Sequence, residues 1–154
     1  MVEMVKANLK RVADQSKLSA PLPVRIQHPY QYTKWDSIHE PFNVVENVLR
    51  DDASGYKALS PAIDLTLSGG QFCFVAEALL YPGDTGPASV QCYVSNVPEK
   101  WTLVKEYKCS KSEVVRLTLP GEQVAKYFRV KCVNNVKGGN IVSIRYIVVK
   151  GIIK

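Results

Sequence analysis

The sequence has little histidine and no clustered cysteine, and both shortages narrow what the protein can do. Its two histidines are His28 and His39, and its four cysteines form no C-x-x-C pair, so the usual ligands of a zinc site are missing. The G-x-S-x-G, P-loop and G-x-G-x-x-G motifs of common catalytic and nucleotide sites are missing too. We therefore expect a protein that catalyses nothing and carries no cofactor.

Long apolar runs are also missing. None approaches the roughly 18 residues that a membrane-spanning helix needs. Residues 1–12, MVEMVKANLKRV, lack the apolar core and the small-residue cleavage site of a secretory signal. The sequence therefore predicts a cytoplasmic protein without a membrane span, whose cysteines are reduced and act as small buried side chains.

What is present is a moderate excess of positive charge on a chain of one-domain size. The 154 residues carry a formal net charge of +6, and 46% of them are hydrophobic, which is enough for a full core. The lysines and arginines form no single block. Solvated lysines on outer faces explain this charge as well as an acidic partner does, so nucleic acid is a less favoured partner.

Alternation of apolar and polar residues dominates the chain after its first 20 residues. Residues 63–67, for example, place their isoleucine and leucines on one face of a strand. Turn clusters such as Pro82–Pro87 separate such strands at short intervals, which is typical of β-sandwiches and barrels, and Gly151 is expected to end the last strand. The predicted strands cover residues 24–27, 63–67, 72–81, 89–95, 101–107, 114–119, 126–133 and 141–149.

Two segments have helical spacing instead. Apolar residues recur at intervals of three and four between Val2 and Val12, so residues 1–20 are expected to form a short amphipathic helix and a linker. Residues 41–49 are predicted as a helix or turn. The remaining residues, 21–154, read as one all-β sandwich domain.

Four segments, taken in order, point to a known family. Glu46–Tyr56 resembles the element E-N-ϕ-L-D-D-D-x-x-T-x-W, with Tyr56 in place of the tryptophan. Ala62–Leu67 resembles the alternating strand that follows that element. Lys126–Lys131 is similar to a K-Y-ϕ-R-ϕ-K strand, and Val142–Gly151 to the last strand. These are landmarks of discoidin (factor V/VIII type C) domains, which this chain resembles over nearly the whole domain.

The resemblance implies a jelly-roll β-sandwich of the galactose-binding-like superfamily. It fits the intracellular branch of the family better than the secreted branch, because secreted discoidin domains usually join their ends with a disulfide and this chain has no terminal cysteine pair. Most intracellular relatives are docking modules for other proteins. We therefore expect a protein-interaction module of an intracellular assembly, of ciliary, centrosomal or ubiquitin-related type.

The resemblance also implies where a partner would bind, since loops at one end of discoidin-type sandwiches form the ligand surface. The aromatic segment His28–His39 resembles one of these loops by position, and its rings suit a protein partner or a sugar ring. The same rings could instead cover the open end of the core. The expected partner-binding residues are His28, Tyr30, Tyr32, Trp35, Tyr56, Asn134 and Asn135.

Two further functions stay open as alternatives. A carbohydrate-binding module would place aromatic rings beside amides and carboxylates, for which Asn134, Asn135 and Asp52 are available. A nucleic-acid-binding domain of a repair scaffold would use the basic residues of the second half, among which Arg129 and Lys131 are expected to share a solvated face with Arg145.

The pair Asp51 and Asp52 has two interpretations. Together with Ser54 and backbone carbonyls, their carboxylates could supply the hard oxygen ligands of a calcium ion, and relatives sometimes hold a structural ion at this turn. The favoured interpretation is an aspartate-rich turn after the helical segment, in which the carboxylates accept hydrogen bonds from backbone amides.

Overall fold

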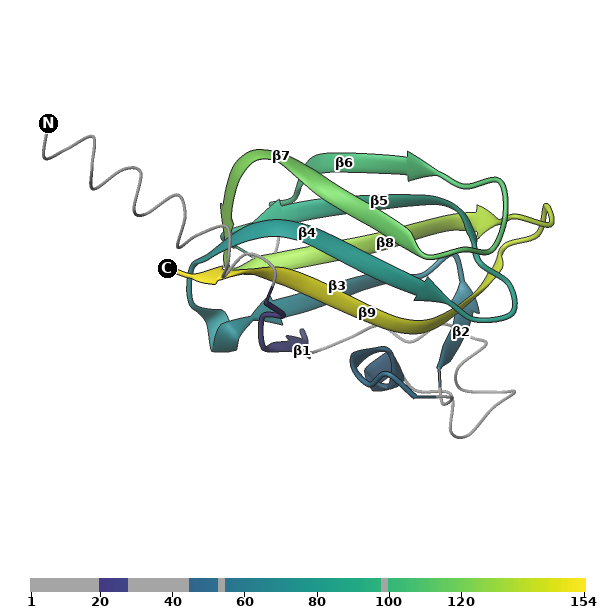
Figure 1. Cartoon of the computed structure of the whole chain (residues 1–154), viewed down its shortest axis with the longest axis horizontal. Helices are drawn as coiled ribbons and strands as arrows, with labels where there is room; N and C mark the ends of the chain where they lie inside the picture. Colours follow the sequence, from purple (N-terminus) through teal and green to yellow (C-terminus); the bar gives the residue numbers. More distant parts are fainter. Residues whose placement is uncertain (1–19, 28–44, 53–54, 98–99) are drawn as a thin grey trace, which may run out of the picture.

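The computed structural model describes residues 20–27, 45–52, 55–97 and 100–154. Within them, nine strands and two short 3₁₀ turns follow one another along the chain (Figure 1). The expected N-terminal helix lies outside the described residues. No helix among those that are described is long and apolar enough to cross a membrane. The elements are β1 (Val24–Ile26), η1 (Val45–Leu49), β2 (Tyr56–Leu59), β3 (Ala62–Leu67), η2 (Ser68–Gly70), β4 (Cys73–Pro82), β5 (Pro87–Ser95), β6 (Thr102–Lys108), β7 (Val115–Ala125), β8 (Tyr127–Asn135) and β9 (Ile141–Ile153).

The strands form two antiparallel sheets that face each other. One sheet has five strands in the order β1-β3-β8-β5-β6, and the other has four in the order β2-β9-β4-β7. Figure 1 shows the four-stranded sheet lying across the five-stranded one, with the C-terminus at one end of the sandwich. The β8–β9 hairpin projects at the other end. Most neighbouring strands in the sheets are distant in sequence. The two facing sheets confirm the all-β sandwich that the sequence predicts.

Alternation explains how the core forms. Ile63 and Leu65 of β3 are fully buried, whereas Asp64 between them is half-exposed on the outer face. In β8, Phe128 and Val130 face inward in the same way. Burying such side chains from two facing sheets contributes roughly 25 cal/mol for each Å² of apolar surface removed from water. The inward residues of both sheets therefore merge into one core cluster.

The cysteines belong to this core. Cys73, Cys92 and Cys132 are buried and Cys109 is half-buried, and all four thiols are free. Burial raises the pKa of Cys92 to about 12, although nearby Lys105 opposes the shift. Burial likewise raises the pKa of Cys132. Thiols held in this way are poor nucleophiles, so they act as packing residues, as the sequence predicts.

Several strand boundaries differ from the sequence prediction. The strand β2 was not expected, because its four residues are too few to show a period. The pairing of β4 with β7 is interrupted between Thr118, which pairs with Glu77, and Gln123, which pairs with Val75. Beyond this interruption the pairing continues to Ala125. The predicted end at Leu119 is therefore an irregularity inside one longer strand.

The predicted break at Gly151 is wrong. This glycine pairs with Val75 inside the ladder between β4 and β9, which continues to Ile153. A Cβ atom at Gly151 would collide with the carbonyl oxygen of Phe74. The glycine therefore permits the close approach of two backbones rather than a turn.

Candidate functional site

The element around Asn47 holds a turn against the four-stranded sheet. Val45 and Val48 of η1 are fully buried, and the Asn47 side chain is 3% exposed. The Asn47 Nδ2 donates to the carbonyl oxygen of Gly55 at 2.8 Å, and its Oδ1 accepts from Arg50 Nη2 at 2.6 Å. This one amide therefore ties residues on both sides of Asp51 and Asp52 to η1, which explains physically why the motif carries an asparagine.

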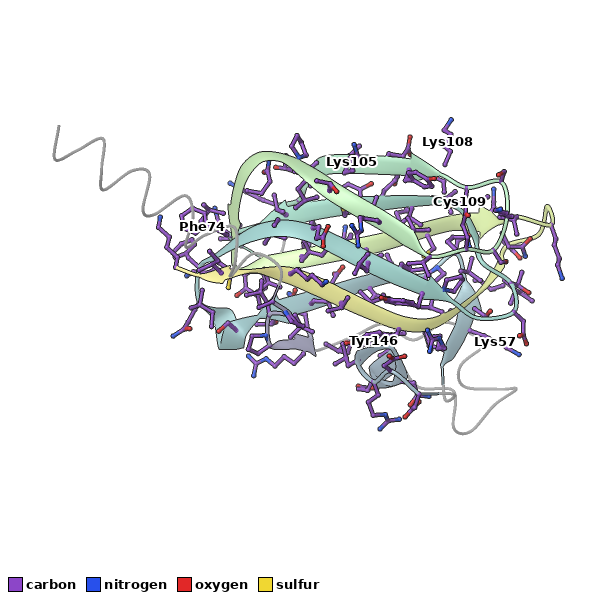
Figure 2. The ribbon with its side chains drawn as sticks, viewed as in Figure 1. Lys57, Phe74, Lys105, Lys108, Cys109 and Tyr146 are labelled. Atoms are coloured by element: carbon purple, nitrogen blue, oxygen red, sulfur yellow. The ribbon has the colours of Figure 1, made fainter. Side chains whose placement is uncertain are left out.

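An aromatic and charged cluster lies beside this turn. Arg145 Nη1 donates to Asp51 Oδ1 at 2.7 Å, and the Arg145 guanidinium carbon lies 5.3 Å from the centre of the Tyr81 ring. The Tyr81 and Tyr146 rings stack with their centres 5.6 Å apart and their planes at 28°. We call Asp51, Tyr81, Arg145 and Tyr146 the tyrosine cluster. Figure 2 places Tyr146 on the side of the sandwich that carries η1.

A local irregularity in β9 creates this cluster. Tyr81 pairs with Tyr146 but Pro82 pairs with Ile144, so Arg145 is the extra residue of a bulge. Ile144 and Ile147 on either side are buried, whereas Arg145 and Tyr146 are both half-exposed. A regular strand would send these two neighbours to opposite faces. Because of the bulge, the side chains of Arg145 and Tyr146 both lie on the outer face of the sheet.

The cluster stays open to solvent. The Arg145 side chain is 43% exposed and that of Asp51 is 58% exposed. Tyrosine rings offer a flat apolar surface with a polar tip, while guanidinium donors and carboxylate acceptors match the hydroxyl groups of a polar ligand. This surface is suited to a ligand that combines ring faces with hydroxyl groups, and it contains no group arranged as a nucleophile and base.

The β8–β9 hairpin is organised by Asn135. Its Nδ2 donates to the carbonyl oxygen of Ile141 at 2.8 Å, and its Oδ1 accepts from the backbone N–H groups of Lys137 and Gly139. The residue is 8% exposed, so its amide is used within its own hairpin. Asn134 is exposed with a φ of 53°, and its backbone N–H donates to Ser60 Oγ. Of the two asparagines, Asn134 alone presents its side chain to solvent.

Two serines fix the neighbouring turn between β4 and β5. Ser143 Oγ accepts from the backbone N–H of Thr85 at 2.8 Å, and Ser112 Oγ accepts from that of Gly86 at 2.7 Å. The N–H of Gly83 donates to the carbonyl oxygen of Ser143. The described loops at this end are thus held in place by side chains from other loops and strands, which favours a preformed surface.

The predicted site residues have different outcomes. His28, Tyr30, Tyr32 and Trp35 lie outside the described residues, so their role stays a prediction. Tyr56 is 1% exposed and packs in the core between the sheets. The ring therefore has almost no surface open to solvent, and contact of Tyr56 with a partner stays a prediction.

The aspartate pair contacts arginines. Asp51 accepts from Arg145, and Asp52 Oδ2 lies 3.5 Å from Arg50 Nε. Among the residues that the structure describes, no group of three histidine, cysteine, aspartate or glutamate side chains is arranged to hold a metal ion. Calcium binding at Asp51 and Asp52 stays a prediction.

The sequence pattern does not predict the tyrosine cluster. The expectation that Arg145 shares a face with Arg129 and Lys131 is wrong, because Arg145 lies on β9 of one sheet and the other two lie on β8 of the other sheet. Nothing in the local pattern marks Tyr81 or Tyr146, since their pairing joins strands 65 residues apart in sequence (146 − 81).

Comparison with solved structures identifies the fold. The chain is similar to the C-terminal domain of a chitobiase from Bacteroides fragilis, with 12% identity and a TM-score of 0.64 over 85% of this chain and 95% of that one. It is also similar to the family 32 carbohydrate-binding module of Streptococcus pneumoniae EndoD, with 16% identity and a TM-score of 0.63 over 82% and 94%.

A third similar structure contains a sugar. The module CpGH89CBM32-5 from Clostridium perfringens, in complex with GalNAc-β-1,3-galactose, matches with 14% identity and a TM-score of 0.61 over 84% of this chain and 93% of that one. No family model and no curated protein matches the sequence. The chain therefore has the two-sheet β-sandwich fold of these structures, and the sandwich fold expected from the resemblance is confirmed.

Proposed function

We propose that this chain is a non-catalytic carbohydrate-binding module and that the tyrosine cluster forms part of its sugar-binding surface. The observation that carries the proposal is the stacked Tyr81–Tyr146 pair beside the solvent-exposed Arg145 and Asp51. Aromatic rings next to hydrogen-bonding charged groups are the combination that a sugar ring with its hydroxyl groups requires.

The similar structures support a sugar over a protein partner. From the sequence, an intracellular protein-interaction role is expected first and carbohydrate binding is the alternative. Two of the three similar structures bear the name of a carbohydrate-binding module or contain a disaccharide. These likenesses concern the fold, so sugar binding by this chain depends on its own residues. The intracellular protein-interaction role stays a prediction without support from these structures.

A glycan array followed by calorimetry tests the proposal. The wild-type protein is expected to bind at least one class of neutral or amino-sugar glycan. Tyr146→Ala should weaken that binding about tenfold, because losing one stacking ring removes roughly 1–1.5 kcal/mol of affinity. Tyr81→Ala should have a similar effect.

Tyr107→Ala is the matched control. Tyr107 is 41% exposed on β6 of the other sheet, so its replacement should leave both folding and sugar affinity unchanged. A glycan array without any bound glycan would contradict the proposed function. Wild-type affinity in Tyr146→Ala would instead show that the sugar binds elsewhere on the module.

A further inference from the structure

A cavity of about 600 Å³ opens at the end of the sandwich opposite the β8–β9 hairpin. It is bordered by β1, by the η2 turn between β3 and β4, and by the start of β8. Figure 1 shows the η2 turn at the end where the C-terminus lies. The tyrosine cluster contributes no residue to it. The cavity is lined by Arg25, Ile26, Gln27, Thr66, Gly69, Gly70 and Tyr127.

Strand register brings the polar lining residues into one row. Arg25 of β1 pairs with Thr66 of β3, and Thr66 pairs with Tyr127 of β8. Thr66 is 4% exposed and therefore lies at the floor, whereas Arg25 is exposed at the rim. Three adjacent strands thus present a cation, a hydroxyl group and a phenol to one space that is large enough for a monosaccharide.

One polar atom in this wall lacks a partner. Gln27 Oε1 is buried and accepts no hydrogen bond, the sole such side-chain atom found among the described residues. A buried acceptor without a donor is unfavourable, and a ligand that supplies a hydroxyl donor would remove that cost. The acceptor therefore favours a hydroxylated ligand over a purely apolar one.

The charge of Arg25 is also not neutralised by a neighbour. Among the described residues, no ion pair includes Arg25, and none of the cavity residues carries a carboxylate. The nearby Asp64 is already occupied, because it accepts from Arg129 Nε at 2.6 Å and from Arg129 Nη2 at 3.0 Å. A guanidinium without a partner pairs best with a planar carboxylate.

The glycines keep the cavity accessible. Gly69 and Gly70 have φ values of 67° and 94°, and a Cβ atom at either would meet nothing within 4 Å. Their backbone is therefore open to a ligand, and the left-handed conformation disfavours a side chain that would fill the space.

We propose that this cavity binds a small hydroxylated carboxylate of the uronic acid class. The carboxylate pairs with Arg25, a hydroxyl group donates to Gln27 Oε1, and Tyr127 forms part of the wall around the ring. The inference does not depend on the proposed function of the tyrosine cluster, because the two sites share no residue and lie on different sheets.

Titration followed by amide chemical shifts tests the proposal, with glucuronate, glucose and acetate as probes. Glucuronate should shift the amides of Gly69 and Gly70 in a saturable way. Glucose lacks the carboxylate and acetate lacks the hydroxyl groups, so each should bind at least tenfold more weakly. Absence of glucuronate shifts at these glycines, or equal affinity for acetate, would overturn the proposal.

Variants locate the two interactions. Arg25→Gln should weaken glucuronate binding at least tenfold, since a charge-assisted pair is lost. Gln27→Met keeps the volume but removes the buried acceptor, and should weaken binding several-fold. Arg116→Gln, a 65% exposed arginine on β7, is the matched control and should bind as the wild type does. Unchanged affinity in Arg25→Gln would overturn the proposal.

The two proposals can fail separately. Tyr146→Ala should weaken binding at the tyrosine cluster about tenfold and leave the glucuronate shifts at Gly69 and Gly70 unchanged. Arg25→Gln should weaken glucuronate binding in the cavity and leave binding at the tyrosine cluster unchanged. If Tyr146→Ala removed the glucuronate shifts at these glycines, the cavity would not be an independent site and the inference would be wrong.

Discussion

On the outer side of each sheet, an arginine lies beside an aspartate and two aromatic rings, but the two groups differ in how exposed their charged side chains are to solvent. On the five-stranded sheet, Arg129 binds Asp64 through two nitrogens and lies 4.3 Å from the centre of the Trp101 ring. Its side chain is 28% exposed and that of Asp64 is 26% exposed. On the four-stranded sheet, Arg145 makes one hydrogen bond to Asp51, and both side chains are more exposed.

This difference separates a structural contact from a candidate binding site. The Arg129 guanidinium also lies 5.9 Å from the Tyr93 ring, so ring faces and a carboxylate already occupy it. Tyr93 in turn donates to Gln91, which donates to Glu106, and the network crosses to β6. Residue types alone therefore do not mark a site. A candidate binding site is distinguished by hydrogen-bonding groups and ring faces that remain exposed to solvent.

The largest effect on stability is expected at Arg129. Arg129→Gln should lower the free energy of unfolding by about 2 kcal/mol, because it leaves a half-buried Asp64 carboxylate without its two charge-assisted hydrogen bonds. For a domain of this size that corresponds to roughly 4–8 °C in the unfolding midpoint, measured by calorimetry. Sugar binding at the tyrosine cluster should not change. An unchanged midpoint would remove the structural role assigned to this pair.

A smaller effect on stability is expected at Arg145. Arg145→Gln should lower the free energy of unfolding by less than about 0.5 kcal/mol, since exposed ion pairs contribute little. Its effect on sugar affinity should be larger, at several-fold, measured by the same calorimetric titration as for Tyr146→Ala. If Arg145→Gln destabilised the protein as much as Arg129→Gln, the distinction between an open and a closed group would be lost.

The smallest effect is expected from calcium. The Asp51 and Asp52 carboxylates already lie against Arg145 and Arg50, so millimolar calcium and a chelator should give the same unfolding midpoint. The Asp51→Asn variant should also have the same unfolding midpoint in calcium and in chelator. A calcium-dependent rise in the midpoint of the wild type that is absent in Asp51→Asn would instead establish a calcium site at this turn.

Much of the fold could be predicted because its signals are local. Alternation in β3, β5 and β8 placed Ile63, Cys92 and Phe128 in the core, and turn chemistry separated the strands. The element Glu46–Tyr56 was also informative, since Asn47 and Tyr56 are buried there. Asn47 holds the turn and Tyr56 fills part of the core. Within the same element, Asp51 contacts the tyrosine cluster.

The sequence by itself determined an all-β sandwich, buried thiols and the absence of a common catalytic motif, because strand periodicity and motif spacing are properties of neighbouring residues. The tertiary structure alone decided which arginine is occupied and which is open. Arg129 meets Asp64 across strands 65 residues apart, and Arg145 reaches the outer face beside Tyr146 only through a bulge in the pairing of β4 with β9. Such contacts depend on sheet order and register, which no short segment of the chain contains.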